Sequence, residues 1–311
     1  MTHKIDDLLE AVLESYARHP HIRKIGETQF PKRERILEAL RKLQYIVFPG
    51  FFDQKELRGD NIRFYTGQLL EEIRETLLEQ VAKTLRMFKE EYKQTAEDEL
   101  KERSAEIVDA FLSAIPKIRE YLATDIEAAY EGDPAAFSRD EVISSYPGIY
   151  ATMVNRIAHE LYELGVPLIP RVMTEHAHSV TGIDIHPGAK LGKYFFIDHG
   201  TGIVIGETAE IGEHAKIYQG VTLGALSTRG GQQLKGRKRH PTVEDDVTIY
   251  SGASILGGET VIGGGVVVGG NAFVTKSVPE QTRVSAKMPE LQFKRNENVE
   301  FQNGEFLTYE I

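Results

Sequence analysis

The feature that most constrains the fold is an aliphatic residue that returns at every sixth position over residues 185–273. A helix repeats its apolar positions about every 3.6 residues and a half-buried strand every second residue, so this period requires short strands joined by tight corners. Successive strands of this kind coil into a parallel β-helix, and stacked coils share one apolar core. The positions are Ile185, Leu191, Ile197 and Ile203, then Ile205, Ile211, Ile217 and Leu223, and finally Val243, Ile249, Ile255, Val261, Val267 and Phe273.

Composition excludes several functional classes. The chain has 311 residues, 41% of them hydrophobic, and a formal net charge of -10, which argues against nucleic acid or an anionic membrane as a partner. No apolar run reaches the length of a membrane span, and the N-terminus lacks the apolar stretch of a signal peptide, so we expect a cytoplasmic location. The absence of cysteine excludes disulfides, thiolate metal ligands and cysteine nucleophiles.

The pattern before residue 180 is helical instead. Apolar residues recur with helical spacing in several segments, one of which runs without a break from Ile107 to Ile126, and Ser138 to Glu141 has the form of a capping box. The chain is therefore predicted to contain a helical domain over 1–180, a β-helix over 181–284 and a polar tail over 285–311. Because the six-residue period stops after Leu223, residues 224–242 are predicted to leave the β-helix as an extended loop.

Four motifs stand out in and around the β-helix: Asp184-Ile-His-Pro187, Asp198-His199-Gly-Thr-Gly-Ile-Val-Ile-Gly-Glu-Thr208, Gln219-Gly-Val-Thr-Leu-Gly224 and Arg239-His240-Pro241. Together they closely resemble the bacterial serine acetyltransferases, a family of hexapeptide-repeat acyltransferases. The resemblance covers roughly Tyr121 to Pro279, whereas residues 1–110 have no clear match. It implies an α+β fold, in which an N-terminal helical domain precedes a left-handed parallel β-helix. The implied reaction is acetyl transfer from acetyl-CoA to the hydroxyl of L-serine, the first step of cysteine biosynthesis, with acetyl-CoA as co-substrate and no permanently bound cofactor or metal.

His199 and Asp184 are the candidate catalytic residues. A serine hydroxyl is a weak nucleophile at neutral pH and needs a base as it attacks a thioester, and histidine suits that role. The resemblance implies that His199 is this base and that Asp184 orients it, as the acid of a Ser-His-Asp triad does. The spacing alone also fits a histidine bonded to a corner of the backbone and a turn-forming carboxylate.

The acceptor amino acid needs fixed charges of both signs. The resemblance places its ammonium group at Asp133 and Asp198, and its carboxylate near Arg239 and His240. On the residues alone, Asp133 could equally end a helix, and Arg239 could belong to a solvated basic loop.

Contacts to CoA follow from the resemblance alone, and they involve Gly224, Ala225, Ser251, Gly252 and Gly269. The rest of the basic loop could hold the CoA phosphates or could be solvated; it comprises Lys235, Arg237 and Lys238. The sequence departs from the family in its longer loop, in Ser251 where alanine is common, and in Ser285-Ala-Lys-Met-Pro289.

The family forms trimers with active sites between subunits, usually paired into hexamers, so the same assembly is expected here. A terminal isoleucine in the family inserts into O-acetylserine sulfhydrylase, and Ile311 is its counterpart. A frayed tail without a partner is the alternative for this segment.

Two rival functions use the same fold. A zinc site could be built from His186, His199 and His214, although no closely spaced pair of ligands lies within one coil. A non-catalytic scaffold that binds the sulfhydrylase is the second rival, and the presence of Asp184, His199 and Arg239 together argues against it.

Overall fold

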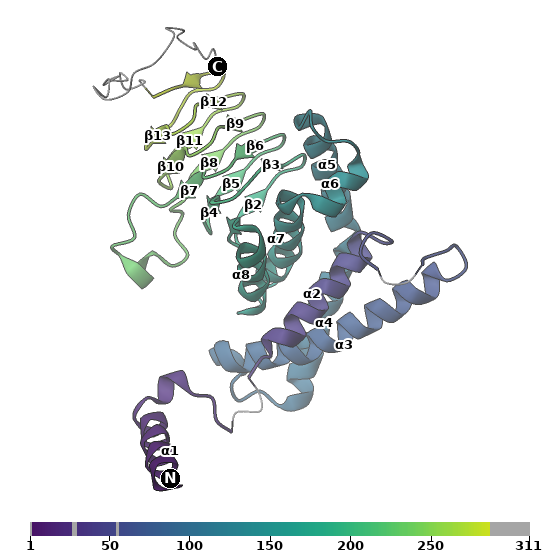
Figure 1. Cartoon of the computed structure of the whole chain (residues 1–311), viewed down its shortest axis with the longest axis vertical. Coiled ribbons are helices and arrows are strands. Elements are labelled where there is room, and N and C mark those ends of the chain that lie inside the picture. Colours follow the sequence, from purple (N-terminus) through teal and green to yellow (C-terminus); the bar gives the residue numbers. More distant parts are fainter. Residues whose placement is uncertain (1, 27–29, 54–55, 287–311) are drawn as a thin grey trace, which may run out of the picture.

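The computed structural model describes residues 2–26, 30–53 and 56–286. A helical part forms one end of the molecule and a parallel β-helix forms the other, with the N-terminus and the last coils far apart (Figure 1). The predicted fold class, an N-terminal helical domain followed by a left-handed parallel β-helix, is confirmed. Within the described ranges, no helix combines the length and hydropathy that a membrane span needs.

The helical part contains eight α-helices among the described residues. They are α1 (Thr2–Arg18), α2 (Arg33–Val47), α3 (Ile62–Phe88), α4 (Glu97–Ser113), α5 (Ile115–Gly132), α6 (Arg139–Ser145), α7 (Pro147–Glu163) and α8 (Ile169–Thr181), with short 3-10 turns at Pro20–Ile22 and Glu90–Tyr92. The prediction of one unbroken segment from Ile107 to Ile126 is wrong, because α4 ends at Ser113 and α5 begins at Ile115. Pro116 lies in the first turn of α5 and has no N–H group to continue the hydrogen bonds of α4.

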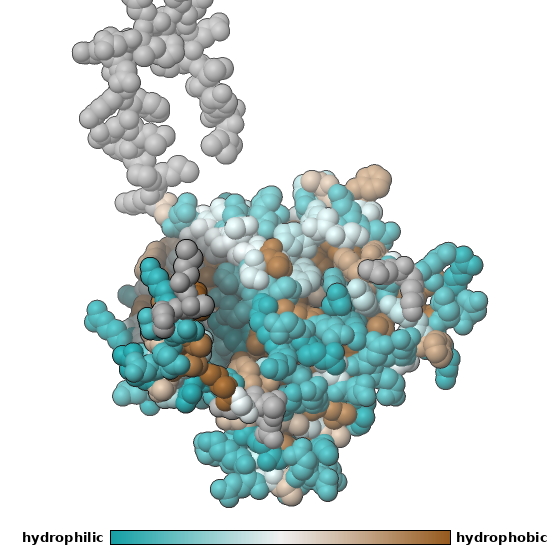
Figure 2. All heavy atoms as spheres, turned by 60° about the horizontal axis from the view of Figure 1, so that its bottom comes forward, coloured by the Kyte–Doolittle hydropathy of each residue, from teal (hydrophilic) through white to brown (hydrophobic). Residues whose placement is uncertain are grey.

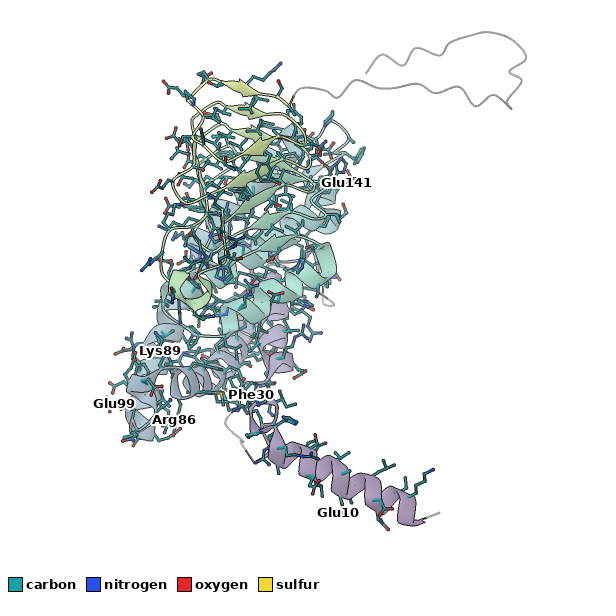
Figure 3. All side chains as sticks on the ribbon, turned by 90° about the vertical axis from the view of Figure 1, so that its left-hand side faces the viewer. Glu10, Phe30, Arg86, Lys89, Glu99 and Glu141 are labelled. Carbon is teal, nitrogen blue, oxygen red and sulfur yellow. The ribbon has the colours of Figure 1, made fainter. Side chains whose placement is uncertain are left out.

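Helices α2 to α8 share one apolar core, whereas α1 stands apart from it (Figures 1 and 3). Its apolar residues repeat with helical spacing but remain exposed, for example Ile5 at 67% and Leu9 at 52%. In the space-filling view, a strip of hydrophobic residues lies between hydrophilic ones on the left-hand lobe, which α1 forms (Figure 2). The periodicity of α1 therefore marks a helix whose apolar face no other described part of the chain covers.

The predicted capping box at the start of α6 is present. The backbone N–H of Glu141 donates to the Ser138 hydroxyl over 3.1 Å, and the Glu141 carboxylate accepts from the Phe137 N–H over 2.6 Å. The first bond satisfies an amide of the first helical turn that has no partner within the helix, and the second satisfies the amide of Phe137, the residue before the N-cap. This cap fixes the turn between α5 and α6, which carries Asp133.

The β-helix is a three-sided prism with one parallel sheet on each side. Sheet A has the order β1-β4-β7-β10-β13, sheet B has β11-β8-β5-β2, and sheet C has β14-β12-β9-β6-β3. The strands are β1 (Asp184–Ile185), β2 (Lys190–Leu191), β3 (Phe196–Asp198), β4 (Val204–Ile205), β5 (Glu210–Ile211), β6 (Lys216–Tyr218), β7 (Thr222–Gly224), β8 (Thr242–Val243), β9 (Thr248–Ile249), β10 (Ser254–Leu256), β11 (Val261–Ile262), β12 (Val267–Val268), β13 (Phe273–Val274) and β14 (Arg283–Val284).

The corners of the prism stack residues in the left-handed backbone region. The turns that lead from sheet C into sheet A, here called the His199 corner, have such residues at Gly202, Gly220, Gly252 and Asn271, and Gly182, which caps α8 just before β1, begins the same column. Hydrogen bonds run along the column, for example from the Gly220 N–H to the Thr201 carbonyl and from the Gly252 N–H to the Gln219 carbonyl. Glycine suits this column because φ is positive there, for example 72° at Gly220, and residues with a Cβ rarely adopt that conformation.

The first coil carries two extra residues at the His199 corner. The strands from β1 to β7 start six residues apart, except that Phe196 and Val204, the first residues of β3 and β4, are eight apart. The turn between them contains His199 and Gly200, and both have positive φ angles, 59° and 88°. The second aliphatic run of the sequence is shifted by two residues from the first because this corner is two residues longer than the others in these coils.

A second shift makes part of the third predicted run wrong. Val261, Val267 and Phe273 were expected in the core, but Ile262, Val268 and Val274 are the buried residues, and Phe273 is 72% exposed. The starts of β10 and β11 are seven residues apart instead of six, and Gly257 turns the chain there with φ 109°. One additional corner residue exchanges the inward and outward positions of every later strand, because side chains alternate along a strand.

A buried ion pair joins the helices to the first coil. The Arg156 guanidinium of α7 donates to both carboxylate oxygens of Asp125 on α5, over 2.6 and 2.7 Å. It also donates to the carbonyls of Leu191 and Gly192, and Asp125 accepts from the Phe195 N–H. Both side chains are almost completely buried, at 6% and 0% exposure. This pair therefore fixes α5 and α7 against the start of the β-helix.

Candidate active site

The His199 corner presents an exposed imidazole beside a carboxylate. The side chain of His199 is 73% exposed, and its Nε2 lies 3.8 Å from Oδ1 of Asp198, which is only 16% exposed. The left-handed backbone at His199 is uncommon for a residue with a Cβ, and the following Gly200 approaches Ile183 so closely that a Cβ there would lie 2.5 Å from it. The backbone thus holds His199 out of the prism, where its ring can meet a ligand.

Asp133 lies at the same end of the β-helix, at the C-terminus of α5. Its Oδ2 accepts from the Tyr146 hydroxyl over 2.6 Å, and its Oδ1 accepts from the Ala135 N–H over 2.8 Å. The Tyr146 hydrogen bond, the Ala135 amide and the nearby charge of His199 lower the pKa of Asp133. Asp133 raises the pKa of Tyr146 to about 12, so tyrosine stays the donor. Asp133 lies close enough to His199, and Asp198 close enough to Tyr146, to interact electrostatically, so both carboxyl groups lie near this corner.

Asp184 begins β1 at the edge of sheet A that follows the His199 corner. Its backbone pairs with Val204 of β4, and its side chain points away from the core because the next residue, Ile185, is buried. Among the described residues, no hydrogen bond joins the Asp184 side chain to His199. The two residues thus share one edge of the prism without a direct contact in the single chain.

A second cluster occupies the turns that lead from sheet A into sheet B, here called the His240 corner. Thr208 is its centre: its hydroxyl accepts from the backbone N–H groups of Arg239 and His240 over 2.9 and 3.0 Å. The Thr208 N–H also donates to Nδ1 of His240 over 3.0 Å. A Cβ at Gly206 would lie 2.2 Å from Nε2 of His240, so only glycine leaves room for the ring. These contacts tie the end of the long loop to the β4–β5 corner.

Arg239 is paired with a carboxylate in the same cluster. Its guanidinium donates to Glu207, which also accepts from the Tyr162 hydroxyl of α7 over 2.9 Å. Burial opposes ionisation of Glu207, but the Arg239 and Tyr162 hydrogen bonds outweigh it and lower its pKa. Burial and Glu207 raise the pKa of Tyr162 to about 12. The guanidinium is thereby held in a fixed position, and the Arg239 side chain remains partly exposed, at 24%.

The imidazoles of this corner are neutral at physiological pH. Burial, followed by the charge of Arg239, lowers the pKa of His240 to about 4. Burial, followed by the charge of Arg171, lowers the pKa of His186 to about 4 as well. Because Nδ1 of His240 accepts from Thr208, the neutral ring carries its proton on Nε2. His240 therefore offers an N–H donor rather than a positive charge.

The single chain does not bring the two predicted halves of the acceptor site together. Asp133, Asp198 and His199 lie where the chain enters sheet A, whereas Arg239 and His240 lie where it leaves that sheet for sheet B. The short strand β4, from Val204 to Ile205, and its neighbours separate the clusters. The residues of each cluster lie close to one another, but the two clusters lie at opposite edges of sheet A.

The predicted CoA residues are divided in the same way. Ser251, Gly252 and Gly269 lie on the side of the His199 corner, in the coils beyond His199, whereas Gly224 and Ala225 lie at the other edge of sheet A. In the basic loop, Lys238 donates to the carbonyls of Thr208 and Pro241 over 2.6 and 3.3 Å. Burial lowers the pKa of Lys238. This lysine supports the base of the loop, and a phosphate would have to compete with both carbonyls.

The three histidines of the zinc alternative lie at three different corners. His186 belongs to the His240 corner, His199 to its own, and His214 to the corner between sheets B and C, where its ring stacks on Tyr194 with centroids 4.3 Å apart. Over the residues that the structure describes, no group of three or more His, Cys, Asp or Glu side chains could hold a metal ion.

Several residues of the two clusters were not predicted. Thr208 and Glu207 lie within the quoted motif, and their roles could have been sought there, because a hydroxyl and a carboxylate at a corner need partners. Tyr146 and Tyr162 come from helices distant in sequence, and no local pattern indicates them. Tyr162 reaches Glu207 across 45 positions of the chain, a contact that only the packing of α7 on the prism creates.

The fold is that of a helical domain followed by a parallel β-helix, as expected for a hexapeptide-repeat acyltransferase, and comparisons with known proteins specify the family. No family model matches the chain. It is 44% identical over 222 residues to a plasmid-encoded serine acetyltransferase of Synechococcus elongatus, covering 70% of each protein. It superposes on the structure of Entamoeba histolytica serine acetyltransferase isoform 3 in complex with cysteine with a TM-score of 0.69 and 36% identity, covering 95% of this chain and 96% of that one. It also superposes on the structure of E. histolytica serine acetyltransferase 1 in complex with L-cysteine, with a TM-score of 0.67 and 39% identity. That superposition covers 82% of this chain and 87% of the other.

The chain therefore belongs to the serine acetyltransferase family. The sequence-based identification as a serine O-acetyltransferase is confirmed.

Proposed function

We propose that the protein transfers the acetyl group of acetyl-CoA to the hydroxyl of L-serine, giving O-acetylserine and CoA for cysteine biosynthesis. The observation that supports this most is the His199 corner, where an exposed imidazole lies beside two carboxylates suited to an ammonium group. Membership of the serine acetyltransferase family supports the choice of acceptor and of acyl chemistry.

In this proposal His199 is the general base. Its imidazole takes the proton of the serine hydroxyl while the oxygen attacks the thioester carbonyl, and the imidazolium then returns a proton to the departing CoA thiolate. Asp133 and Asp198 hold the serine ammonium, and Asp184 orients the base. The exposure of His199 supports its role, because the base must reach a substrate that enters from solvent.

We further propose that Arg239 and His240 of a neighbouring subunit complete the site. A guanidinium fork and an Nε2–H donor suit a carboxylate, and Glu207 and Thr208 hold both groups in place. The two clusters lie at opposite edges of sheet A, so a trimer that places the His240 corner of one prism beside the His199 corner of the next would unite them. Pairing of two trimers into a hexamer stays a prediction.

The donor would lie along the same groove between prisms. Ser251, Gly252 and Gly269 line one edge above His199, and Gly224 and Ala225 line the other, so an extended pantetheine arm could contact backbone on both sides.

The division of the chain into domains, with limits at residues 180 and 284, is likewise a proposal. The sulfhydrylase contact through Ile311 lies outside the described residues and stays a prediction.

The release of CoA thiol tests the reaction directly. With acetyl-CoA and L-serine the protein should release thiol, and with L-homoserine or no acceptor it should release far less. A thiol reagent reports this cleanly because the protein itself has no cysteine. No release with any acceptor would contradict the proposed reaction and leave the scaffold role as the better explanation.

Mixing two inactive variants tests the shared site. Trimers of His199→Ala or of Arg239→Ala alone lack one half of every site, but mixed trimers contain some interfaces with both halves intact. After the variants are refolded together in equal amounts, activity should recover to about a quarter of the wild-type value, the fraction expected for random assembly of subunits that share sites. If each site lay within one chain, mixing would restore nothing.

A further inference from the structure

Lys216 lies where the carboxylate-bearing end of α5 meets the β-helix. It is the first residue of β6, and its Nζ donates to the Gly132 carbonyl over 2.5 Å. Gly132 is the last residue of α5 and immediately precedes Asp133. Lys216 therefore connects the second coil of the prism to the residue beside a proposed ligand of the acceptor.

Two aromatic rings hold this ammonium group in place. Nζ lies 4.8 Å from the ring centroid of Phe196 and 5.1 Å from that of Tyr218, so it interacts with one ring in each of two adjacent coils. The same Phe196 ring packs against Gly132 so closely that a Cβ there would lie 2.7 Å from it. The end of α5 is thus fixed by one hydrogen bond and by one contact that tolerates only glycine.

The hydrogen bond has a clear physical role. The last carbonyls of a helix have no partner within the helix and carry the negative end of its dipole, so a lysine ammonium is well matched to one of them. Without that bond, the Asp133 carboxylate would keep only its side-chain hydrogen bonds with Tyr146 and the Ala135 amide, and the Phe196 packing would be what holds the end of α5 to the prism. Both of those hydrogen bonds come from the chain just after α5, not from the prism.

We infer that Lys216 is a positioning residue for the acceptor amino acid, because it ties the residue before Asp133 to β6, the strand that pairs in register with β3 and its Asp198. This inference rests on the proposed function, in which both carboxylates bind the serine ammonium. Tyr218 supports the geometry, since it pairs in register with Asp198 on the neighbouring strand. Lys216 itself is not expected to contact the reacting atoms.

The test is the Lys216→Met variant, which keeps an unbranched apolar side chain between the two rings but removes the charge and the donor. We expect the KM for L-serine to rise about tenfold, in keeping with the loss of a hydrogen bond from a charged group. The KM for acetyl-CoA and kcat should stay within about threefold, because neither the donor groove nor His199 loses a contact. Calorimetric binding of L-serine without acetyl-CoA should weaken by the same factor as KM.

Lys193→Met is the matched control. Lys193 also joins the helical part to the prism, through Glu120 over 2.6 Å, and also lies near an aromatic ring, 5.3 Å from Tyr121, but it does not contact the end of α5. Its loss should leave the serine KM unchanged, and Lys216→Arg should restore part of the affinity. Tyr146→Phe combined with Lys216→Met should raise KM by less than the product of the single effects, because both residues position one carboxylate.

An unchanged or lower serine KM in Lys216→Met would overturn the inference, as would an equal rise in Lys193→Met. Failure of the proposed function is distinguishable, because the wild-type protein would then neither release thiol with L-serine nor bind it.

Discussion

Replacement of His199 by alanine is expected to lower kcat for acetyl transfer by about a thousandfold, the middle of the range for loss of a general base. The physical reason is that the serine hydroxyl would have to lose its proton to water as it attacks the thioester. The KM for L-serine should change little, because Asp133 and Asp198 remain in place to hold the ammonium group. Thiol release under saturating substrates measures the effect.

His214→Ala is the matched control for this variant. His214 also lies at a corner of the prism in a left-handed conformation, with φ 57° against 59° at His199. Any loss of stability from placing alanine in the left-handed region should therefore be similar in the two variants. His214 stacks on Tyr194 at a different corner from Asp133 and Asp198, so its loss should not affect catalysis. His199→Ala that keeps activity within a few-fold of wild type would remove His199 from the mechanism, provided that both variants unfold at similar denaturant concentrations.

Replacement of Asp125 by alanine is expected to lower the free energy of unfolding by about 3–5 kcal/mol, the typical cost of leaving a buried charge without its partner. The guanidinium of Arg156 would keep its carbonyl partners at Leu191 and Gly192 but lose both bonds to the carboxylate. The Phe195 N–H would lose its acceptor as well. Urea unfolding at a fixed protein concentration measures the difference.

An exposed ion pair between the same two helices provides the comparison. Lys117 of α5 and Glu160 of α7 lie 2.8 Å apart, with the lysine 58% exposed, so Glu160→Ala should cost no more than about 1 kcal/mol. The double replacement Asp125→Leu with Arg156→Met should recover much of the lost stability, since apolar side chains leave no buried charge. A cost for Asp125→Ala as small as that for Glu160→Ala would show that the buried pair does not fix α5 against α7.

The sequence period predicted the β-helix because every coil repeats the same demand for an inward aliphatic residue. The period also shifts by two residues before Ile205, and the structure shows that His199 lies in the widened corner that causes this shift. The prediction failed after Ile255, since Val261 and Ile262 are both aliphatic and the period alone cannot choose between them. The extra residue near Gly257 decides which one is buried, and a turn length is not visible in hydrophobicity.

The candidate site was predictable in its parts but not in its arrangement. Motifs locate His199 and Arg239, but only the coiling of the chain shows that they lie at opposite edges of sheet A. Contacts between distant segments were equally hidden, as in the hydrogen bond from Lys216 to Gly132, which spans 84 positions. Local patterns report what one segment needs, whereas these contacts depend on how helices settle on the prism.

The long loop leaves and re-enters the prism at a single corner, and this has an evolutionary consequence. The ladder of backbone hydrogen bonds continues on both sides of the gap, with the Gly257 N–H bonded to Gly224 and the Glu210 N–H bonded to Pro241. Thr208 fixes only the last residues of the loop, Arg239 and His240. Residues can therefore be inserted or deleted between Ala225 and Lys235 while the coils keep their register. Natural variation or design could reshape this segment, and with it the surroundings of the bound substrates, on a scaffold that stays the same.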